Sequence, residues 1–399
     1  MDTSRAAALR FLSAMPLNFL RNPSRVRPAA ATATLLVFAI SLDAFGFLLV
    51  SRVPNFTLDT LMYLHMAQYG PGSVPAPYSF RVLVPFIAAH MHVPVAIGLK
   101  IIAGISLALS LWFAGLCAIR TGASTKGAAA GILVLFCSRT VLYQFHNPYL
   151  TDAPGLMILM AMMLVSLDSH AGIFGVLGAS GLLVRESMVF MVPSMLFSRQ
   201  WKRGIAVCAM CAAVFLGPRF LLGSTYSRYL HSGGMIQYNL GHPLRWAALV
   251  TLSWYMAWPL LPIGLALMPR KHVAAVAGTT LTLGLGCIAS CMMAGDLERM
   301  CIVLAPVMGI GAAHVFDRLF RRQQGLALAT LTIWVGELFA MCQYVGHPGT
   351  HMVAALAFSL PALVLLAYAI RSLWPEARTG IKDKVAMVRE GAPSLFAQA

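Results

Sequence analysis

Acidic residues are scarce in this sequence, which has 13 Asp and Glu against 29 Lys and Arg among 399 residues. Charged residues make up 11% of the chain and hydrophobic residues 59%, and a soluble domain could not keep that much apolar surface out of water. The composition therefore excludes a soluble protein and indicates one embedded in a membrane. An ionisable group near hydrocarbon is costly, so each of the few acids is a functional candidate.

Several motifs are also absent. The chain has no GxSxG elbow, no Walker loop and no GxGxxG fingerprint, so a serine hydrolase, an ATPase and a nucleotide-binding domain have no support. No HExxH occurs, and we expect no certain cofactor, although carboxylates could hold a divalent cation transiently. The eight cysteines lie in or beside apolar runs, and the CxxC pair of Cys208 and Cys211 has no second pair, which indicates ordinary packing.

The excess of basic residues does not indicate a nucleic-acid partner. Lys and Arg lie mostly in short loops between apolar runs and near the two ends of the chain, where they set the orientation of membrane helices. We therefore expect membrane lipid or a lipid-linked anion as the partner, and no nucleic acid.

The apolar runs predict an all-α, polytopic membrane protein with both termini in the cytoplasm. A helix needs about 20 residues to cross the hydrocarbon, so the runs predict about 12 transmembrane helices, within limits of about 10 to 13. The expected spans are 30–50, 93–119, 128–145, 153–167, 204–222, 247–268, 273–294, 300–316, 326–344 and 352–370, with two short helices in 172–197.

Segment 172–197 could make a single span, but the basic stretch 199–203 would then face outward. The preference of basic residues for the cytoplasmic side favours a hairpin of two short helices, with Arg185 and Glu186 at its outer apex. The whole chain then divides into a basic cytoplasmic segment 1–29, a transmembrane domain 30–370 whose outer loop 51–92 carries the candidate site, and a mobile cytoplasmic tail 371–399.

Three acids fall on the predicted outer face, each where a hydrophobic helix begins or a loop approaches one. They are Asp59, Asp152 and Asp296. Tyr63 follows Asp59 by one helical turn, so both project from one face. Partial dehydration would raise the pKa of Asp59 toward the range useful for a general base, whereas the alternative is a solvated acid on a loop helix.

The other two acids also have structural alternatives. Asp152 stands just before Ala-Pro, where a helix begins, and could simply be an N-cap. Asp296 could make a contact with Arg299 in the first turn of a helix, worth only tenths of a kcal/mol.

Cations accompany these acids on the predicted outer face. Arg81 begins an apolar interfacial helix, where it either snorkels to lipid headgroups or clamps a lipid phosphate. Arg185 and Glu186 interrupt an apolar segment, either as an ion pair that fixes the hairpin or as part of a site. Lys100 lies about two turns into the second span and is the only lysine close to this side.

Taken in order, several short motifs resemble the bacterial membrane glycosyltransferases of the GT-C superfamily, which includes aminoarabinose transferases and protein O-mannosyltransferases. The motifs are the acid of the first outer loop (Asp59), PYSFRVLVP, NPYLTD, LVRES and GDLER, and the resemblance covers residues 59–306. It implies an inverting transfer of a sugar from a polyprenyl-phosphate donor to a glycan, lipid or protein acceptor of the cell envelope, on the outer face of the bacterial inner membrane.

The resemblance also implies roles for individual residues. Asp59 matches the general base that deprotonates the acceptor hydroxyl, and Asp152 matches an acid that orients acceptor or base. Cations would neutralise the leaving polyprenyl phosphate, because charge develops on it in the transition state. The candidate substrate-binding residues are Arg81, Arg185, Glu186, Tyr63, Lys100, Asp296 and Arg299. The sequence departs from the pattern by having one first-loop acid where many relatives have a pair, and we expect a short form without a large periplasmic domain.

Other functions are open. A transporter or flippase of a lipid-linked sugar or another anionic amphiphile would also use charged groups, but no internal repeat is evident and the acids lie outside the predicted midplane. A glycan polymerase, a membrane acyltransferase and a non-catalytic scaffold are the further alternatives.

Overall fold

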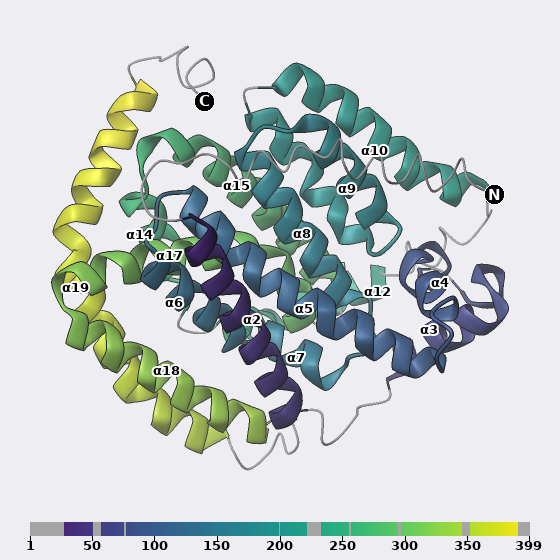
Figure 1. Ribbon diagram of the computed structural model, residues 1–399, viewed down its shortest axis with the longest axis horizontal. Coiled ribbons are helices and arrows are strands. Elements are labelled where there is room, and N and C mark those ends of the chain that lie inside the picture. Colours follow the sequence, from purple (N-terminus) through teal and green to yellow (C-terminus); the bar gives the residue numbers. More distant parts are fainter. Residues whose placement is uncertain are drawn as a thin grey trace.

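Helices build every regular element in the part of the chain that the computed structural model describes (Figure 1). That part comprises residues 28–50, 57–75, 77–198, 200–221, 233–254, 257–293, 297–344 and 352–389. The predicted all-α class is confirmed for these residues. Asp296, the third outer acid, lies outside them, as do residues 1–27 of the basic N-terminal segment.

Five helical segments are long and apolar enough to cross a membrane, which supports a multi-pass membrane protein. They are α2 (Pro28–Val50), α5 (Val95–Arg120), α10 (Trp201–Leu221), α15 (Arg270–Met293) and the segment Cys301–Arg322, which joins η7 (Cys301–Leu304) to α17 (Ala305–Arg322).

A sixth span is formed if α6 (Thr125–Phe136) and α7 (Arg139–His146) are counted together, since they are bent by 60° at a short break. Helices α8 (Asp152–Leu167) and α9 (Ala171–Leu182) are apolar but shorter than a full span. The expected count of about 12 spans stays a prediction.

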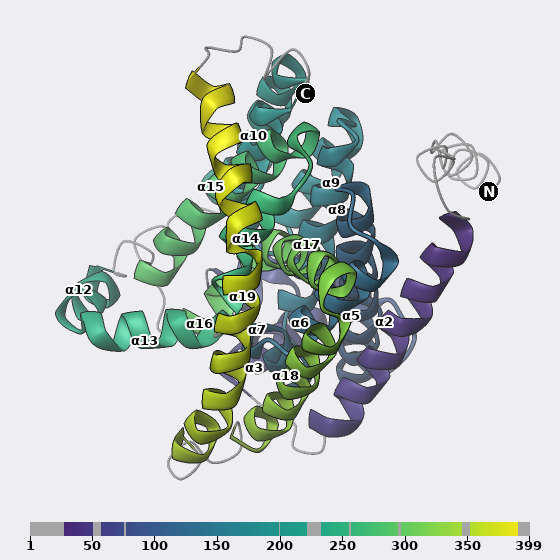
Figure 2. The same ribbon diagram turned by 90° about the vertical axis from the view of Figure 1, so that its left-hand side faces the viewer.

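Two expected span boundaries differ in the structure. Segment 247–268 forms two helices, α13 (Pro243–Trp254) and α14 (Leu260–Leu267), and α13 projects from the side of the molecule with α12 (Gly233–Gly241) (Figure 2). At the other end of the chain, α18 (Gln324–Tyr344) precedes α19 (Met352–Arg389), which continues past Ile370 without a break. Ion pairs of Asp383 with Arg270 and of Glu376 with Arg322 connect this extension to α15 and α17.

The predicted hairpin in segment 172–197 is supported. After α9, the chain continues through two 3-10 helices, η4 (Glu186–Phe190) and η5 (Val192–Phe197). Glu186 lies 3.8 Å from Arg219 near the end of α10, whereas Met195 packs at Gly204 near the start of α10. The segment therefore reverses direction at Arg185 and Glu186.

The central helix is α17, and 94% of its span is buried. It packs against α5, α6 and α14. Its contact with α14 is close, because a Cβ added at Gly264 would lie 2.5 Å from the Cα of Gly311 and closer still to the Gly311 carbonyl oxygen. Only a glycine lets the two backbones approach in this way, a device that membrane helices use often.

This contact predicts a stability effect. Gly264→Ala is expected to destabilise the protein by about 1–3 kcal/mol, since neither backbone can yield to the new methyl group. Gly284→Ala on α15 is the matched control, because nothing lies within 4 Å of its added Cβ. Thermal unfolding of the detergent-solubilised variants measures both effects. Equal unfolding temperatures for the two variants would contradict the close contact.

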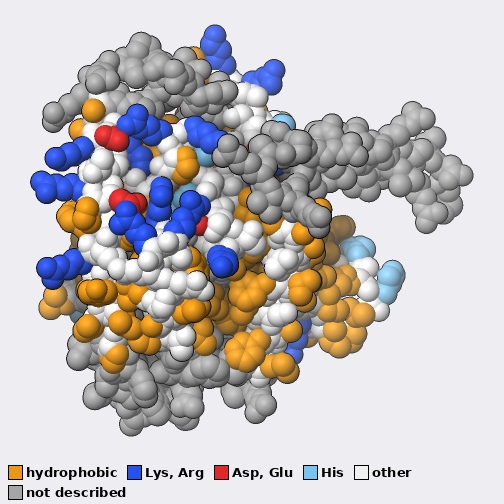
Figure 3. Space-filling model, turned by 60° about the vertical axis from the view of Figure 1, so that its left-hand side comes forward, with side chains coloured by type: hydrophobic (Ala, Val, Ile, Leu, Met, Phe, Trp, Pro, Cys, Tyr) orange, Lys and Arg blue, Asp and Glu red, His pale blue; other side chains and the backbone are white. Residues whose placement is uncertain are grey.

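Basic side chains gather at one end of the molecule, above a band of hydrophobic side chains (Figure 3). Exposed arginines at the start of α15 and the end of α17, Arg270 and Arg322, pair with Asp383 and Glu376 of α19. Arg120 and Asp168, both expected on the cytoplasmic side, pair at 3.6 Å. This grouping agrees with the orientation that the basic loops predict.

The loop after α2 forms a compact helical layer. Thr57 caps α3 (Leu58–Tyr69) by accepting a hydrogen bond from the Thr60 amide, and Gly70 ends it with φ 84°, a conformation that favours glycine. Next come η2 (Pro71–Ser73), η3 (Tyr78–Phe80) and α4 (Leu83–Ala89). Much later in the chain, the short helix α16 (Leu297–Met300) leads into η7. Helices α3 and α16 supply opposite charges to one cluster.

Candidate functional site

Ten polar side chains form two adjacent sets of ion pairs and hydrogen bonds, which together we call the charged network. They come from the α3–η3 layer, the start of α8, the apex of the hairpin, the end of α10, and α16. The members are Asp59, Tyr63, Tyr78, Arg81, Thr151, Asp152, Arg185, Glu186, Arg219 and Arg299. The network thus joins parts of the chain that are up to 240 residues apart.

Arg299 on α16 connects two of the predicted acids. Its Nε donates a hydrogen bond to Asp152 Oδ2 at 2.8 Å, and its Nη2 lies 2.7 Å from the same oxygen. Its Nη1 pairs with Asp59 Oδ2. One guanidinium group therefore holds both carboxylates, and the planar shape of arginine suits such a bridge.

Asp152 also pairs with Arg185 through its other carboxylate oxygen. It is the first residue of α8, and the N-cap is Thr151, whose side chain makes no capping hydrogen bond. The N-cap interpretation of Asp152 is therefore wrong. Its carboxylate turns toward two arginines and is fully buried, which suits a structural anchor for the network better than a reacting group.

A second branch of the network starts at Glu186. Arg81 Nε donates to Glu186 Oε2 at 2.9 Å, and Arg219 Nη2 lies 3.8 Å from Glu186 Oε1. No Arg185–Glu186 ion pair occurs among the described residues, so the two neighbours at the hairpin apex bind different partners. The guanidinium of Arg219 also lies over the rings of Phe80 and Phe215.

Tyr63 brings the two sets side by side, because its ring contacts the Tyr78 ring edge to face with the centroids 5.6 Å apart. Arg81 Nη1 donates to the Tyr63 hydroxyl at 2.7 Å, and that hydroxyl lies 3.2 Å from the Thr151 hydroxyl beside Asp152. Tyr63 was expected to project from the same face as Asp59, but the hydroxyl that donates to Asp59 Oδ1, at 2.5 Å, is that of Tyr78. Arg81 thus turns inward, toward protein groups and not toward headgroups.

The network is rich in arginine. Among the described residues, four guanidinium groups face three carboxylates. Most of these groups are nearly buried, whereas the Asp59 side chain keeps 20% of its surface exposed. Electrostatic interactions are strong where water is excluded, so the arrangement can attract an anion.

The ionisation of Asp59 differs from the expectation. Burial alone would raise its pKa, but the charge of Arg299 and hydrogen bonds from Tyr78 and Arg299 outweigh burial and hold the pKa below its usual value. The predicted upward shift is wrong, because the sequence did not reveal that a cation lies against this acid. Burial and the hydrogen bond to Asp59 raise the pKa of Tyr78, which stays protonated.

The structure brings most of the predicted site residues together. Asp59, Tyr63, Arg81, Asp152, Arg185, Glu186 and Arg299 all belong to the network. Lys100 is not among its members; its ammonium lies 5.3 Å from the centre of the Tyr149 ring, in the loop before Asp152. Asp296 lies outside the described residues, and Arg299 binds Asp59 and Asp152.

Sequence reasoning missed three members of the network. Arg219 lies in segment 204–222, an apolar run expected to span the membrane. A charged residue near the outer end of such a run is a functional candidate. Tyr78 and Thr151 stand within the quoted motifs PYSFRVLVP and NPYLTD, yet a hydroxyl has no charge that marks it in a sequence.

In the part of the chain that the structure describes, the fold is that of an α-helical multi-pass membrane protein with a buried cluster of four arginines and three acids. A comparison with known protein families finds no matching family, and a comparison with curated proteins finds no significant match. The function therefore has to be inferred from the site itself.

Proposed function

We propose that this chain is an integral membrane glycosyltransferase of the GT-C type that takes a sugar from a polyprenyl-phosphate donor. The observation that carries the proposal is the charged network, in which four arginines face three acids next to apolar helices. A lipid-linked sugar phosphate needs both parts: cations for its phosphate and apolar surface for its tail.

Apolar surface for a lipid tail lies on the elements that carry the network. On α3, Leu58 and Leu61 on either side of Asp59 are 64% and 54% exposed, and on α4, Phe86 is 61% exposed. Large exposed apolar side chains of this kind mark a membrane or ligand contact. A polyprenyl chain held there would bring its phosphate toward Arg81, which lies between η3 and α4.

The reaction would begin when the donor phosphate competes with carboxylates for the arginines. Arginine binds phosphate well through paired hydrogen bonds. As Arg299 turns toward the phosphate, the Asp59 carboxylate loses its main partner and becomes a stronger base. Asp59 would then take the proton of the acceptor hydroxyl while the acceptor oxygen attacks the anomeric carbon.

The bond between the anomeric carbon and the phosphate oxygen breaks in the same step, and its electron pair leaves with the phosphate. The guanidinium groups would stabilise this developing charge, which gives them their catalytic effect. Attack from the opposite face inverts the anomeric centre. Asp59 is the acid suited to the base role, since Asp152 is fully buried between two arginines.

A donor assay tests the proposal. Purified protein in detergent is incubated with a panel of polyprenyl-phosphate sugars and an extract of envelope glycans, and release of polyprenyl phosphate is measured. Arg81→Gln is expected to lower kcat/KM for the donor about 10- to 100-fold, because a hydrogen bond to a charged group contributes about 1.5–3 kcal/mol. Arg270→Gln, at the basic end, is the control and is expected to leave the rate unchanged.

Transport is the second candidate, and the bent pair of α6 and α7 favours it, since transporters often place broken helices at their binding sites. Vesicles that contain the protein and a fluorescent lipid-linked sugar separate the two functions. Movement of the lipid between leaflets without release of polyprenyl phosphate would support transport and contradict the glycosyltransferase.

A further inference from the structure

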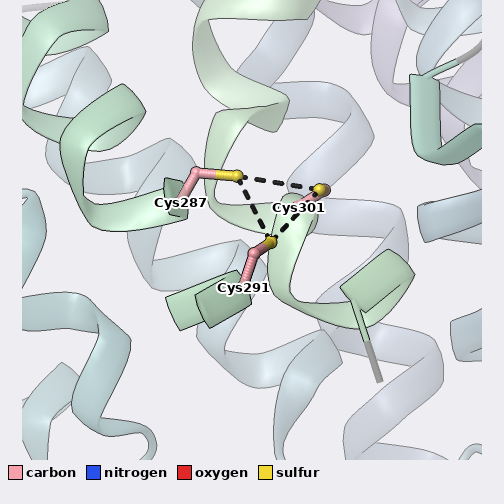
Figure 4. Close-up of side chains that lie close together, drawn as sticks. All are labelled: Cys287, Cys291 and Cys301. Carbon is pink, nitrogen blue, oxygen red and sulfur yellow. Dashed lines mark hydrogen bonds between the residues drawn. The ribbon is translucent and has the colours of Figure 1, made fainter. Parts of the chain in front are cut away.

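Three buried cysteines meet outside the charged network. Cys287 and Cys291 lie one turn apart on one face of α15, and Cys301 begins η7 on the facing segment (Figure 4). At most 4% of the surface of each residue is exposed. The apolar surroundings of the cysteines in the sequence predicted ordinary packing, and no spacing brought these three together.

The distances between their sulfurs fit the coordination of one metal ion. The Sγ atoms are 3.6, 3.7 and 4.0 Å apart, so the three form a nearly equilateral triangle. A point equidistant from three such atoms lies about 2.2 Å from each, close to the ~2.3 Å of a metal–thiolate bond. Figure 4 shows the three side chains pointing toward one another.

We propose that Cys287, Cys291 and Cys301 bind one copper(I) ion in a three-coordinate thiolate site. Thiolates are soft ligands that select copper(I), zinc or iron–sulfur clusters. Structural zinc takes four ligands, and within the described ranges no His, Asp, Glu or fourth Cys joins this group. A site of three sulfurs therefore favours copper(I) over zinc(II).

The surroundings fix the triangle and supply positive charge. Trp254 Nε1 donates a hydrogen bond to the backbone oxygen of Cys301 at 3.1 Å, which holds the start of η7 in place. Each thiol would release its proton as its sulfur–copper bond forms, so the loaded site carries two negative charges. Arg185 Nη2 donates to Met300 Sδ at 3.5 Å, which puts a guanidinium beside the residue before Cys301.

A bound ion would connect α15 to the segment that carries Arg299. Cys301 follows Arg299 by two residues, so the ion would hold α16 and η7 against α15. The ion would thus help to hold Arg299, which bridges Asp59 and Asp152, in its position. This role is independent of the glycosyltransferase proposal, since the same restraint would serve any function of the network.

Copper(I) binding by the full-length protein in detergent tests the proposal. The reduced protein is titrated with copper(I) in competition with a chromophoric bicinchoninate chelator, and zinc(II) is titrated in parallel. We expect one equivalent of copper(I) per chain. Cys291→Ser should lower the affinity at least about 100-fold, since even groups that only orient a metal ligand contribute 10- to 100-fold. Cys117→Ser, at a lone buried cysteine, should change nothing.

X-ray absorption at the copper edge provides a readout that needs no variant. The loaded wild-type protein should show a shell of three sulfur atoms at about 2.3 Å. The proposal is overturned by a nitrogen or oxygen shell, by zinc(II) binding without copper(I) binding, or by equal copper(I) affinity in the wild type and Cys291→Ser. A disulfide among the three cysteines after purification under reducing conditions would also overturn it.

Discussion

Asp152→Asn is expected to destabilise the protein by about 3–5 kcal/mol, the largest effect of any single change in the charged network. The substitution keeps the size of the side chain but removes the charge between Arg185 and Arg299. Both arginines are more than nine-tenths buried, so their charges would lose their compensation where water cannot replace it. Thermal or denaturant unfolding in detergent measures the loss.

An exposed ion pair supplies the control for this experiment. Asp383 pairs with Arg270 at 2.9 Å, but the two side chains are 47% and 62% exposed, so Asp383→Asn should change stability by less than about 1 kcal/mol. A double variant, Asp152→Asn with Arg185→Met, should recover part of the loss, because it removes one of the uncompensated charges. Similar stability of Asp152→Asn and Asp383→Asn would show that the buried charges are not coupled.

Asp59→Asn is expected to lower the rate of sugar transfer about 100- to 10,000-fold while the protein stays folded. The amide can still accept the hydrogen bond from Tyr78, but it cannot take a proton from an acceptor. The fold should survive because Arg299 keeps its two contacts with Asp152. The measurement is kcat with a polyprenyl-phosphate sugar, together with the unfolding temperature of each variant.

Asp168→Asn is the matched control for the Asp59 variant, since Asp168 pairs with Arg120 away from the charged network. It should retain full activity. Asp59→Glu should retain a measurable fraction, because the carboxylate is kept at a changed distance. An Asp59→Asn protein as active as the wild type would exclude Asp59 as the base, and an unfolded one would assign it a structural role.

The sequence predicted which residues share one end of the molecule but not which of them pair. Scarce acids and basic loops were enough to place Asp59, Asp152 and Arg299 on one side. Their contacts depend on side chains 147 and 240 residues apart, which no local spacing encodes. For the same reason the direction of the pKa shift of Asp59 was predicted wrongly, since burial was visible in the sequence and the arginine partner was not.

The boundaries of the helices were also predicted only in part from the sequence. Long apolar runs predicted α2, α5, α10 and α15 closely, because an uninterrupted helix satisfies its own backbone in lipid. The run 247–268 is just as apolar but divides into α13 and α14. Hydrophobicity gives the preference for the membrane but not the ends of a helix: α14 begins after Pro259, its N-cap, and packs against α17.

The bridge made by Arg299 has a consequence for synthesis. Asp59 and Asp152 enter the membrane long before the ribosome reaches α16, since chains are made and inserted from the N-terminus. Until then neither acid has the cation that later binds both. A chain that stops before Arg299 therefore carries acids whose burial is unfavourable, and cellular quality control can recognise it as incomplete.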